Sequence, residues 1–413
     1  MEVRTGKVRY RPFQPEDLGA VQDIIRQSFT EEVDSHPQVL SEYLSEAYYQ
    51  PENLLVAELE DRVVSQMGLR DGDLWLWGCP FPAALVGTVC TLPDFRGQGI
   101  GGGLLRYSFG VLSRWAMALS YLHTIPERHN FYRRLGYTDT VHEQTVLTAD
   151  LAELDAKLLE QQATLPQPVR RRRALPADVP ILESLYRGTA GRGTGAWSRN
   201  SLFWRRRLLG RPKLWLAGCP DFELAVADRP LAYVATIREG SEWRILELAY
   251  RGGADTVARA LVAGVLGAAQ KVGAEGVRVT LPRWMASEEL LSVLASQTAL
   301  RQDRVFVRLH DVGRFLELAT PVLAERADAA DLTVGLSLSG TPSHHVHFGS
   351  GSRQLAVALG PSQLAALFYN GDALPDLLKA NSVKARPESA HTMELLRGLF
   401  PPTRAARFPM DGY

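Results

Sequence analysis

The residues best suited to chemistry in this sequence are a group of glycines that follows an arginine. The segment Arg96-Gly97-Gln98-Gly99-Ile100-Gly101 lies between a strand-like apolar run and a helical pattern. Glycine tolerates positive φ angles and lets the backbone approach a ligand closely. The free N–H groups of a helix's first turn attract anions, and arginine adds a permanent positive charge. These residue types predict a site for a phosphate-bearing ligand.

Two well-known phosphate-binding turns are also rich in glycine, and each has its own requirements. A Rossmann turn follows the first strand of a βαβ unit, whereas this turn follows roughly the fourth expected strand. A P-loop needs Gly-Lys followed by Ser or Thr, which is absent from the segment. Close packing of a helix start is the structural alternative, and it needs no ligand.

The sequence around the turn resembles the coenzyme A signature of the GNAT acetyltransferases. The family's Arg-x-x-Gly-x-Gly pattern is met at Arg96, Gly99 and Gly101, after a Val- and Thr-rich run and a Pro-x-x-Arg. The resemblance implies acetyl-coenzyme A as the co-substrate, and no metal is expected. It implies that the pantetheine arm meets backbone groups of Val89 and Thr91 and that the pyrophosphate meets the amides of Arg96, Gly97, Gln98, Gly99, Ile100 and Gly101.

Acetylation of an amine also needs a proton donor for the departing thiolate. Tyr132 stands in the segment Phe131-Tyr132-Arg133-Arg134-Leu135-Gly136-Tyr137, which resembles the place where GNAT enzymes bring a tyrosine to the sulfur. The resemblance implies that Tyr132 is the general acid, and a core aromatic beside Phe131 is the structural alternative. Many GNAT domains carry an asparagine seven residues earlier, where this chain has Ile125, and Asn130 is the nearest substitute.

The elements that must position these residues predict an α/β unit. Apolar runs that alternate in polarity or are rich in Val and Thr indicate strands, and apolar residues at helical spacing indicate helices. The expected strands cover residues 8–13, 54–59, 63–69, 83–92, 119–124 and 138–147. The expected helices cover about 15–29, 37–48, 101–116 and 126–135.

The opening pattern of the chain returns after 161 residues. Strand, Pro-x-Asp turn and helix recur in one register, which predicts a duplicated domain, with chance similarity of two helix starts as the alternative. In the second copy the turn at Arg251–Asp255 lacks Arg-x-x-Gly-x-Gly, and Asp255 has the character of a helix N-cap. We therefore expect the second copy to be a non-catalytic scaffold. The matched pairs are Arg11 with Arg172, Pro15 with Pro176, Asp17 with Asp178, Leu18 with Val179, Val21 with Leu182 and Ile24 with Leu185.

The last part of the chain has the pattern of a small α+β domain. Two acetyltransferase-like units followed by such a domain resemble the Eis (enhanced intracellular survival) family, and the segment Val307–Val312 agrees with it. In that family the C-terminal domain resembles sterol carrier proteins. The predicted fold class is α/β (α+β): tandem GNAT domains with mixed, mostly antiparallel sheets, followed by a sterol-carrier-protein-like domain. The predicted boundaries are 1–150, 151–302 and 303–413.

Resemblance to the Eis family implies further features of the enzyme. The C-terminal carboxylate of Tyr413 would act as the general base, with Asp411 as a substitute and a frayed tail as the structural alternative. A homohexamer acting on aminoglycoside- or polyamine-like acceptors is expected. Asp34, Ser35 and His36 fall where GNAT folds accept substrate, so they are expected to line the acceptor pocket.

The histidines of the last part are expected to be structural. His344, His345 and His347 lie on one expected strand. They have no partnered carboxylate or cysteine nearby, which favours a solvated or hydrogen-bonded edge strand over a metal site.

Composition narrows the classes of function. The 46 basic and 46 acidic residues cancel, so no charge excess points to nucleic acid. Three cysteines without metal-ligand spacing, no signal-peptide pattern and no long apolar run predict a cytoplasmic protein without membrane partners. The predicted function is acetylation of primary amines on a small-molecule acceptor. The alternatives are a non-catalytic coenzyme A- or lipid-binding protein and an acetyltransferase for protein lysines or N-termini.

Overall fold

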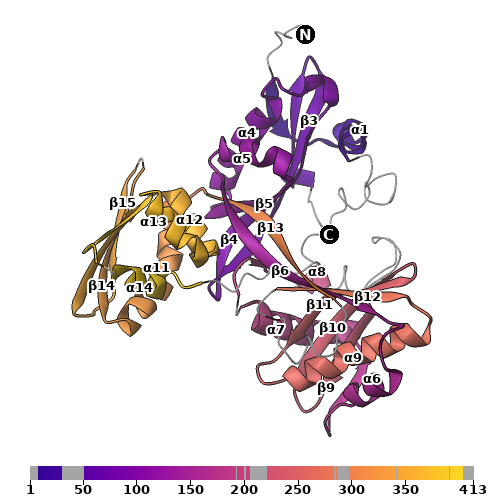
Figure 1. Ribbon diagram of the computed structural model, residues 1–413. Helices are drawn as coiled ribbons and strands as arrows, with labels where there is room; N and C mark the ends of the chain where they lie inside the picture. The colour runs from indigo at the N-terminus through magenta and orange to yellow at the C-terminus, as the bar shows by residue number, and fades with distance from the viewer. Residues whose placement is uncertain are drawn as a thin grey trace. The chain divides into compact units, whose positions relative to one another are not determined.

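The structure, a computed structural model of the 413-residue chain, describes residues 8–29, 51–191, 193–199, 201–204, 221–282, 285, 297–340, 342–389 and 391–402. The chain forms two compact units (Figure 1). The first combines the residues up to Asp73 with Phe81–Thr140 and the segment from Arg304, and the second combines Leu74–Pro80 with Val141–Asp303. Among the described helices, none is both long and apolar enough to cross a membrane.

The sheet of the first unit is mixed and mostly antiparallel. Its strand order is β1-β2-β3-β4-β5-β13. β1 pairs antiparallel with β2, β2 with β3, and β5 with β13, whereas β4 and β5 run parallel. The strands span Arg9–Pro12 (β1), Leu54–Leu59 (β2), Arg62–Leu76 (β3), Cys79–Thr91 (β4), Leu119–His123 (β5) and Gln297–Leu309 (β13).

Helices cover this sheet, and Figure 1 draws α4 and α5 on the opposite side of β3 from α1. In α1 the buried side chains recur at helical spacing, at Val21, Ile24 and Ile25, as the sequence predicts. They belong to the same apolar core as Leu104 of α4 and Tyr132 of α5. The expected helix at 37–48 lies outside the described residues. The helices span Leu18–Ser28 (α1), Ile100–Arg114 (α4) and His129–Arg133 (α5).

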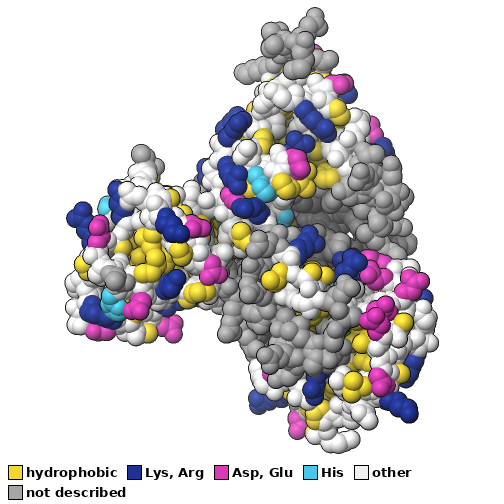
Figure 2. Space-filling view, in the orientation of Figure 1, with side chains coloured by type: hydrophobic (Ala, Val, Ile, Leu, Met, Phe, Trp, Pro, Cys, Tyr) yellow, Lys and Arg dark blue, Asp and Glu magenta, His cyan; other side chains and the backbone are white. Residues whose placement is uncertain are grey.

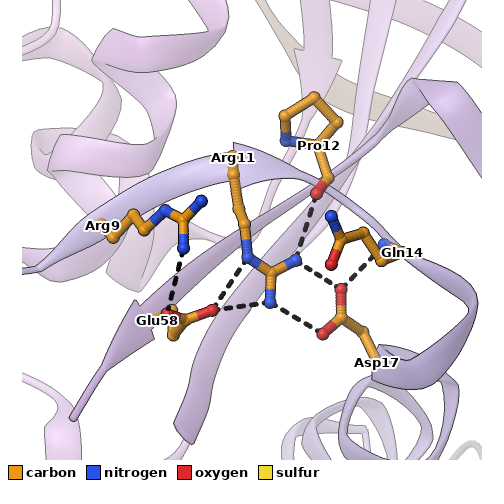
Figure 3. Close-up of polar contacts among 6 residues, drawn as sticks. All are labelled: Arg9, Arg11, Pro12, Gln14, Asp17 and Glu58. Atoms are coloured by element: carbon orange, nitrogen blue, oxygen red, sulfur yellow. Dashed lines mark hydrogen bonds and ion pairs between the residues drawn. The ribbon is translucent and has the colours of Figure 1, made fainter. Parts of the chain in front are cut away.

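An arginine–aspartate pair fixes the start of α1. Arg11 of β1 donates two hydrogen bonds to Asp17, at 2.6 and 2.9 Å, and also bonds Glu58 of β2 (Figure 3). Asp17 accepts a further hydrogen bond from the backbone N–H of Gln14, 2.8 Å away. The hydrogen bonds from Arg11 lower the pKa of Asp17. The buried carboxylate therefore stays charged, because both of its oxygens have partners.

The second unit repeats this pair at the predicted offset of 161 residues. Arg172 donates to Asp178 at 2.6 and 2.8 Å, and the N–H of Leu175 donates to the same carboxylate at 2.8 Å. Because the same contacts recur at the same spacing, the repeat in the sequence corresponds to a repeat in the structure. The elements that carry it are β7 (Arg170–Arg173), a short turn at Pro176–Asp178 and α7 (Val179–Ala190).

The strands of the second unit follow the order β6-β12-β11-β10-β9-β7, and their pairing is also mixed. β11 and β12 run parallel, so the second unit repeats the parallel step between β4 and β5. Asp255 is the first residue of α9 and Ala254 is the N-cap, so the N-cap prediction for Asp255 is wrong by one residue. An acidic first residue still interacts favourably with the helix dipole. The elements span Thr138–Asp150 (β6), Ala156–Gln162 (α6), Ala196–Trp197 (β8), Ser201–Phe203 (α8), Asp221–Val226 (β9), Pro230–Glu239 (β10), Glu242–Tyr250 (β11), Asp255–Lys271 (α9) and Gly276–Pro282 (β12).

The C-terminal part of the first unit is a four-stranded sheet in the order β15-β14-β16-β17, accompanied by helices. Phe315 of α11 and Phe368 of α12 pack on Phe81 of β4, with ring centroids 4.9 and 6.2 Å away. The three domain boundaries and the likeness to sterol carrier proteins stay predictions. The elements span Val312–Ala329 (α11), Leu332–Leu338 (β14), His344–Phe348 (β15), Arg353–Leu359 (β16), Pro361–Tyr369 (α12), Leu374–Lys379 (α13), Val383–Arg386 (β17) and Thr392–Leu399 (α14).

Ser120 of β5 forms polar contacts with Tyr137 and with His310, the residue that follows β13. The hydroxyl of Ser120 lies 2.7 Å from that of Tyr137 and 2.8 Å from Nε2 of His310. Burial, together with the nearby charge of Arg308, lowers the pKa of His310 to about 3. His310 is therefore neutral at physiological pH, and protonating it would place a charge in a desolvated site.

This burial predicts a specific loss of stability in acid. The unfolded chain protonates His310 below about pH 6.5 while the folded chain does not. The free energy of unfolding should therefore fall as pH drops from 6.5 toward 3, by up to about 1.4 kcal/mol per pH unit from this residue. Denaturant unfolding of wild type and His310→Asn between pH 7.5 and 4.5 measures the difference. His345→Asn, at an exposed histidine, is the control. Equal slopes for wild type and His310→Asn would contradict the prediction.

Candidate active site

The glycine-containing turn leads from the end of β4 into α4. Gly97 and Gly99 have φ angles of 77° and 79°, a region in which side chains other than glycine are strained. Gly99 is the N-cap of α4, and the first amide bonded back into the helix is that of Gly103, which donates to Gly99 O. The amides ahead of it form the N-terminal end of a 15-residue helix, where an anion is favoured. The turn from Arg96 to Gly99 is exposed.

Arg96 is anchored beside the turn. Its Nε donates to the carbonyl of Thr91 at 2.9 Å, and Nη2 lies 3.4 Å from Oγ of Ser28 at the end of α1. Gln98 donates from its side chain to Asp94 O at 3.1 Å. The positive charge is therefore held between the end of β4 and the first helix, next to the exposed amides.

Two glycines of α4 serve packing, which is the structural alternative to a ligand site. A Cβ on Gly103 would lie 1.8 Å from the hydroxyl of Tyr10, and one on Gly101 would lie 3.2 Å from Oγ1 of Thr91. At Gly97 and Gly99 a Cβ would meet nothing within 4 Å. Close packing thus explains why residue 103 is glycine and partly why residue 101 is. The positive φ angles explain the glycines at 97 and 99.

The strands around the turn part from each other. The parallel pairing of β4 and β5 joins Ala83–Leu85 with Leu119–Tyr121, and β4 then continues to Thr91. Val89 and Thr91 are half-exposed on this last stretch, whereas Cys90 is buried. Backbone groups of a strand that has left its neighbour must find other partners. The predicted pantetheine contacts, Val89 and Thr91, lie where such partners are needed.

Tyr132 lies on α5 in the core of the first unit. Its ring packs edge-on against Tyr137, at 5.8 Å between centroids, and in a tilted arrangement against Phe306 of β13, at 6.0 Å. Burial raises the pKa of Tyr132 to about 12, with a further contribution from Cys90 and an opposing hydrogen bond with Thr124. The phenol therefore keeps its proton at neutral pH, as a general acid requires.

Tyr132 belongs to the same apolar core as Cys90 of β4. Cys90 precedes Thr91, which accepts the hydrogen bond of Arg96 through its carbonyl. The structure thus brings Tyr132, Thr91 and the glycine turn into one region of the first unit. Cys90 itself had no motif to mark it in the sequence, and only its place on β4 reveals its contact with this region.

The remaining predicted residues have different outcomes. Asp34, Ser35, His36, Asp411 and Tyr413 lie outside the described residues, so their roles stay predictions. His345, on the edge strand β15, lies 3.0 Å from Oγ of Ser337 through its Nδ1, in keeping with a hydrogen-bonded edge. In the part of the chain that is described, no group of three or more His, Cys, Asp or Glu residues could hold a metal ion.

Comparison with known proteins identifies the region that holds this site. Residues 9–139 match the sequence profile of the family described as acetyltransferase (GNAT) domain. These residues are a GNAT acetyltransferase domain. The GNAT domain contains Tyr132, the parted end of β4 and the glycine turn, and it makes the protein an N-acetyltransferase. The fold of this domain is one that binds acetyl-coenzyme A or another acyl-coenzyme A.

Solved structures resemble the chain along its whole length. A GCN5-related N-acetyltransferase from Kribbella flavida is 20% identical, with 98% of each chain covered and a TM-score of 0.69. A probable N-acyltransferase from Enterococcus faecalis is 15% identical, with 98% of this chain and 100% of that chain covered and a TM-score of 0.71. Eis1 from Mycobacterium abscessus is 14% identical, with 97% and 98% covered and a TM-score of 0.62. At these identities the likeness shows a shared fold. No curated protein sequence matches the chain.

The turn geometry predicts the effect of adding one methyl group. Gly99→Ala should cost about 1–2 kcal/mol of conformational strain at φ 79° and distort the amides ahead of α4. We expect coenzyme A affinity, measured by calorimetry, to fall at least about tenfold, which corresponds to about 1.4 kcal/mol. Gly19→Ala in α1, where a Cβ meets nothing within 4 Å, is the matched control and should leave affinity unchanged. Unchanged affinity in Gly99→Ala would contradict the assignment of these amides.

Proposed function

We propose that the GNAT domain transfers the acetyl group of acetyl-coenzyme A to primary amines of a small-molecule acceptor. The observation that carries the proposal is that the buried Tyr132 shares an apolar core with Cys90 and Leu92, at the end of β4 that leads into the glycine turn. The phosphates of coenzyme A need an anion site, and its departing thiolate needs a proton donor, so both at one strand end suit acetyl-coenzyme A.

The proposed donor site uses the backbone. Amides of the turn from Arg96 to Gly101 hold the pyrophosphate, and backbone groups of Val89 and Thr91 hold the pantetheine arm. This arrangement is supported by the exposed turn, the positive φ angles of two glycines and the parting of β4 from β5. In this proposal the thioester lies near Tyr132.

The proposed reaction is direct transfer. The neutral amine attacks the thioester carbonyl, a C–N bond forms and the C–S bond breaks. Tyr132 donates its proton to the departing thiolate. The C-terminal carboxylate of Tyr413, or Asp411 in its place, accepts the proton that the amine loses. Asp34, Ser35 and His36 line the acceptor pocket in this proposal.

The proposed acceptor class is aminoglycoside- or polyamine-like, and the proposed assembly is a homohexamer. Support comes from the likeness to Eis1 from Mycobacterium abscessus over nearly the full length of both chains, together with the sequence resemblance to the Eis family. A panel of aminoglycosides, polyamines and peptides, with thiol release from acetyl-coenzyme A as the readout, tests the acceptor class. Coenzyme A binding without release for any amine would overturn the proposal in favour of a binding protein.

The role of Tyr132 predicts a particular kinetic change. Tyr132→Phe removes the proton donor but keeps the ring, so we expect kcat to fall about 100-fold while the Kd of coenzyme A stays nearly the same. Steady-state kinetics and calorimetry measure the two effects. Tyr107→Phe on α4, whose ring stacks on Tyr10, is the control and should leave kcat unchanged. Full activity of Tyr132→Phe would exclude the general-acid role.

The role of Tyr413 predicts sensitivity to the end of the chain. Adding two glycines after Tyr413 moves the terminal carboxylate away from its proposed position, so kcat should fall while the KM of acetyl-coenzyme A is retained. The same addition at the N-terminus is the control. An extended enzyme with full activity would rule out the terminal carboxylate and leave Asp411 as the candidate base.

A further inference from the structure

Strand β4 contains a strained residue just before the stretch assigned to the acyl donor. Thr88 has a φ of 47°, which is an outlier for a β-branched residue. Left-handed residues inside strands bend the chain and re-aim the groups that follow. They persist only where surrounding contacts hold them, and they cluster at functional sites. The next residue is Val89.

Two side-chain donors hold the carbonyl of Thr88. Nε2 of Gln66, on the neighbouring strand β3, donates to Thr88 O at 2.5 Å, and Sγ of Cys90 donates to it at 3.1 Å. Nε2 of Gln66 also lies 2.9 Å from Sγ of Cys90. Gln66 is 0% exposed and Cys90 is 6% exposed, so water competes little for these hydrogen bonds.

The remaining atom of the Gln66 carboxamide is also informative. Within the described residues, Oε1 of Gln66 is buried and has no hydrogen-bond partner. A desolvated carbonyl oxygen without a partner is costly in a core, and native proteins keep such groups where they serve a function. Oε1 of Gln66 therefore lowers stability, and the hydrogen bonds that the carboxamide does make are those to Thr88 and Cys90.

We propose that Gln66 is a positioning residue for acetyl transfer. Its carboxamide holds the strained Thr88 peptide, and this directs the backbone groups that follow, at Val89 and Thr91, toward the acyl donor. The inference rests on the proposed function of this site. It deepens that function by naming the side chain that sets the geometry of the donor strand.

The second unit shows different chemistry at the equivalent positions. The hydrogen bonds Leu92 N–Val64 O and Arg251 N–Leu231 O join equivalent strands in the two units. Counting two residues on from Val64 and Leu231 aligns Gln66 with Tyr233. Counting four back from Leu92 and Arg251 aligns Thr88 with Glu247.

In the second unit a charged group stands in place of the hydrogen bond from Gln66 to Thr88. Tyr233 donates to Glu247, whose carboxylate forms a bidentate pair with Arg199 at 2.7 Å for each bond. Both side chains of this ion pair are 0% exposed. The second unit, which lacks the glycine pattern, thus has a buried ion pair at this place. The first unit, which has the pattern, has a neutral amide hydrogen-bonded to the strained Thr88.

The test is a substitution that keeps volume and removes the amide. Gln66→Met should lower kcat for acetyl transfer about ten- to a hundredfold, because a small misplacement of a reacting group is enough for that loss. The KM of the amine should not change. Ser108→Ala, equally buried in α4 and bonded to its own helix through Leu105 O, is the matched control for stability and should retain kcat.

A second substitution distinguishes positioning from a purely structural role. Glycine adopts positive φ without strain, so residue 88 should depend less on the hydrogen bond from Gln66 in the Thr88→Gly variant. Gln66→Met should therefore reduce kcat several-fold less in the Thr88→Gly background than alone. If Gln66→Met does not fold, Gln66→Leu, which also lacks the donor, replaces it in both backgrounds. Equal losses in the two backgrounds, or wild-type kcat in Gln66→Met with only a lower Tm, would overturn the inference. A wild-type enzyme without any transferase activity would overturn the proposed function itself.

Discussion

The separation of β4 from β5 is the constraint on which the rest of the site depends. Their parallel pairing covers three residues on each strand, and β4 then continues toward Thr91 beside β3 but no longer paired with β5. Backbone N–H and C=O groups that lose a neighbouring strand need other partners. The exposed glycine turn and the anchored Arg96 follow this stretch, and the buried Tyr132 belongs to the same apolar core as Cys90 within it (Figure 2 shows the surface in the orientation of Figure 1). A ligand that offers amide and phosphate groups in one extended chain suits that arrangement.

The two units show how one supersecondary plan can give two outcomes. Both begin with the same arginine–aspartate pair, and both contain one parallel step in an otherwise antiparallel sheet. In the first unit β4 has a strained residue, Thr88, beyond the residues paired with β5, and the neutral amide of Gln66 donates a hydrogen bond to its carbonyl. In the second unit the corresponding place is occupied by the buried ion pair of Arg199 and Glu247. Because both side chains are desolvated, each charge needs the other as its partner. We infer that catalysis belongs to the first unit.

Local features of this site were predictable from the sequence, and cross-strand features were not. The glycine turn depends on residues adjacent in the chain, and the repeat at 161 residues marked Arg11 and Arg172 as equivalent positions. Their ion pairs with Asp17 and Asp178 were seen only in the structure. Gln66 and Thr88 meet only through the register of two strands, which no local pattern specifies. The contact of Ser120 with His310 spans 190 residues. The N-cap at Asp255 was misplaced by one residue because several residues at a helix start can satisfy the same dipole.

The central claim is that coenzyme A binds on the amides between β4 and α4 of the first unit and not in the second. Hydrogen exchange followed by mass spectrometry, with and without coenzyme A, tests it most directly. We expect slower exchange in peptides that cover residues 89–103 and no change in peptides that cover residues 247–256. Protection of 247–256, or no protection of 89–103 at saturating coenzyme A, would contradict the claim.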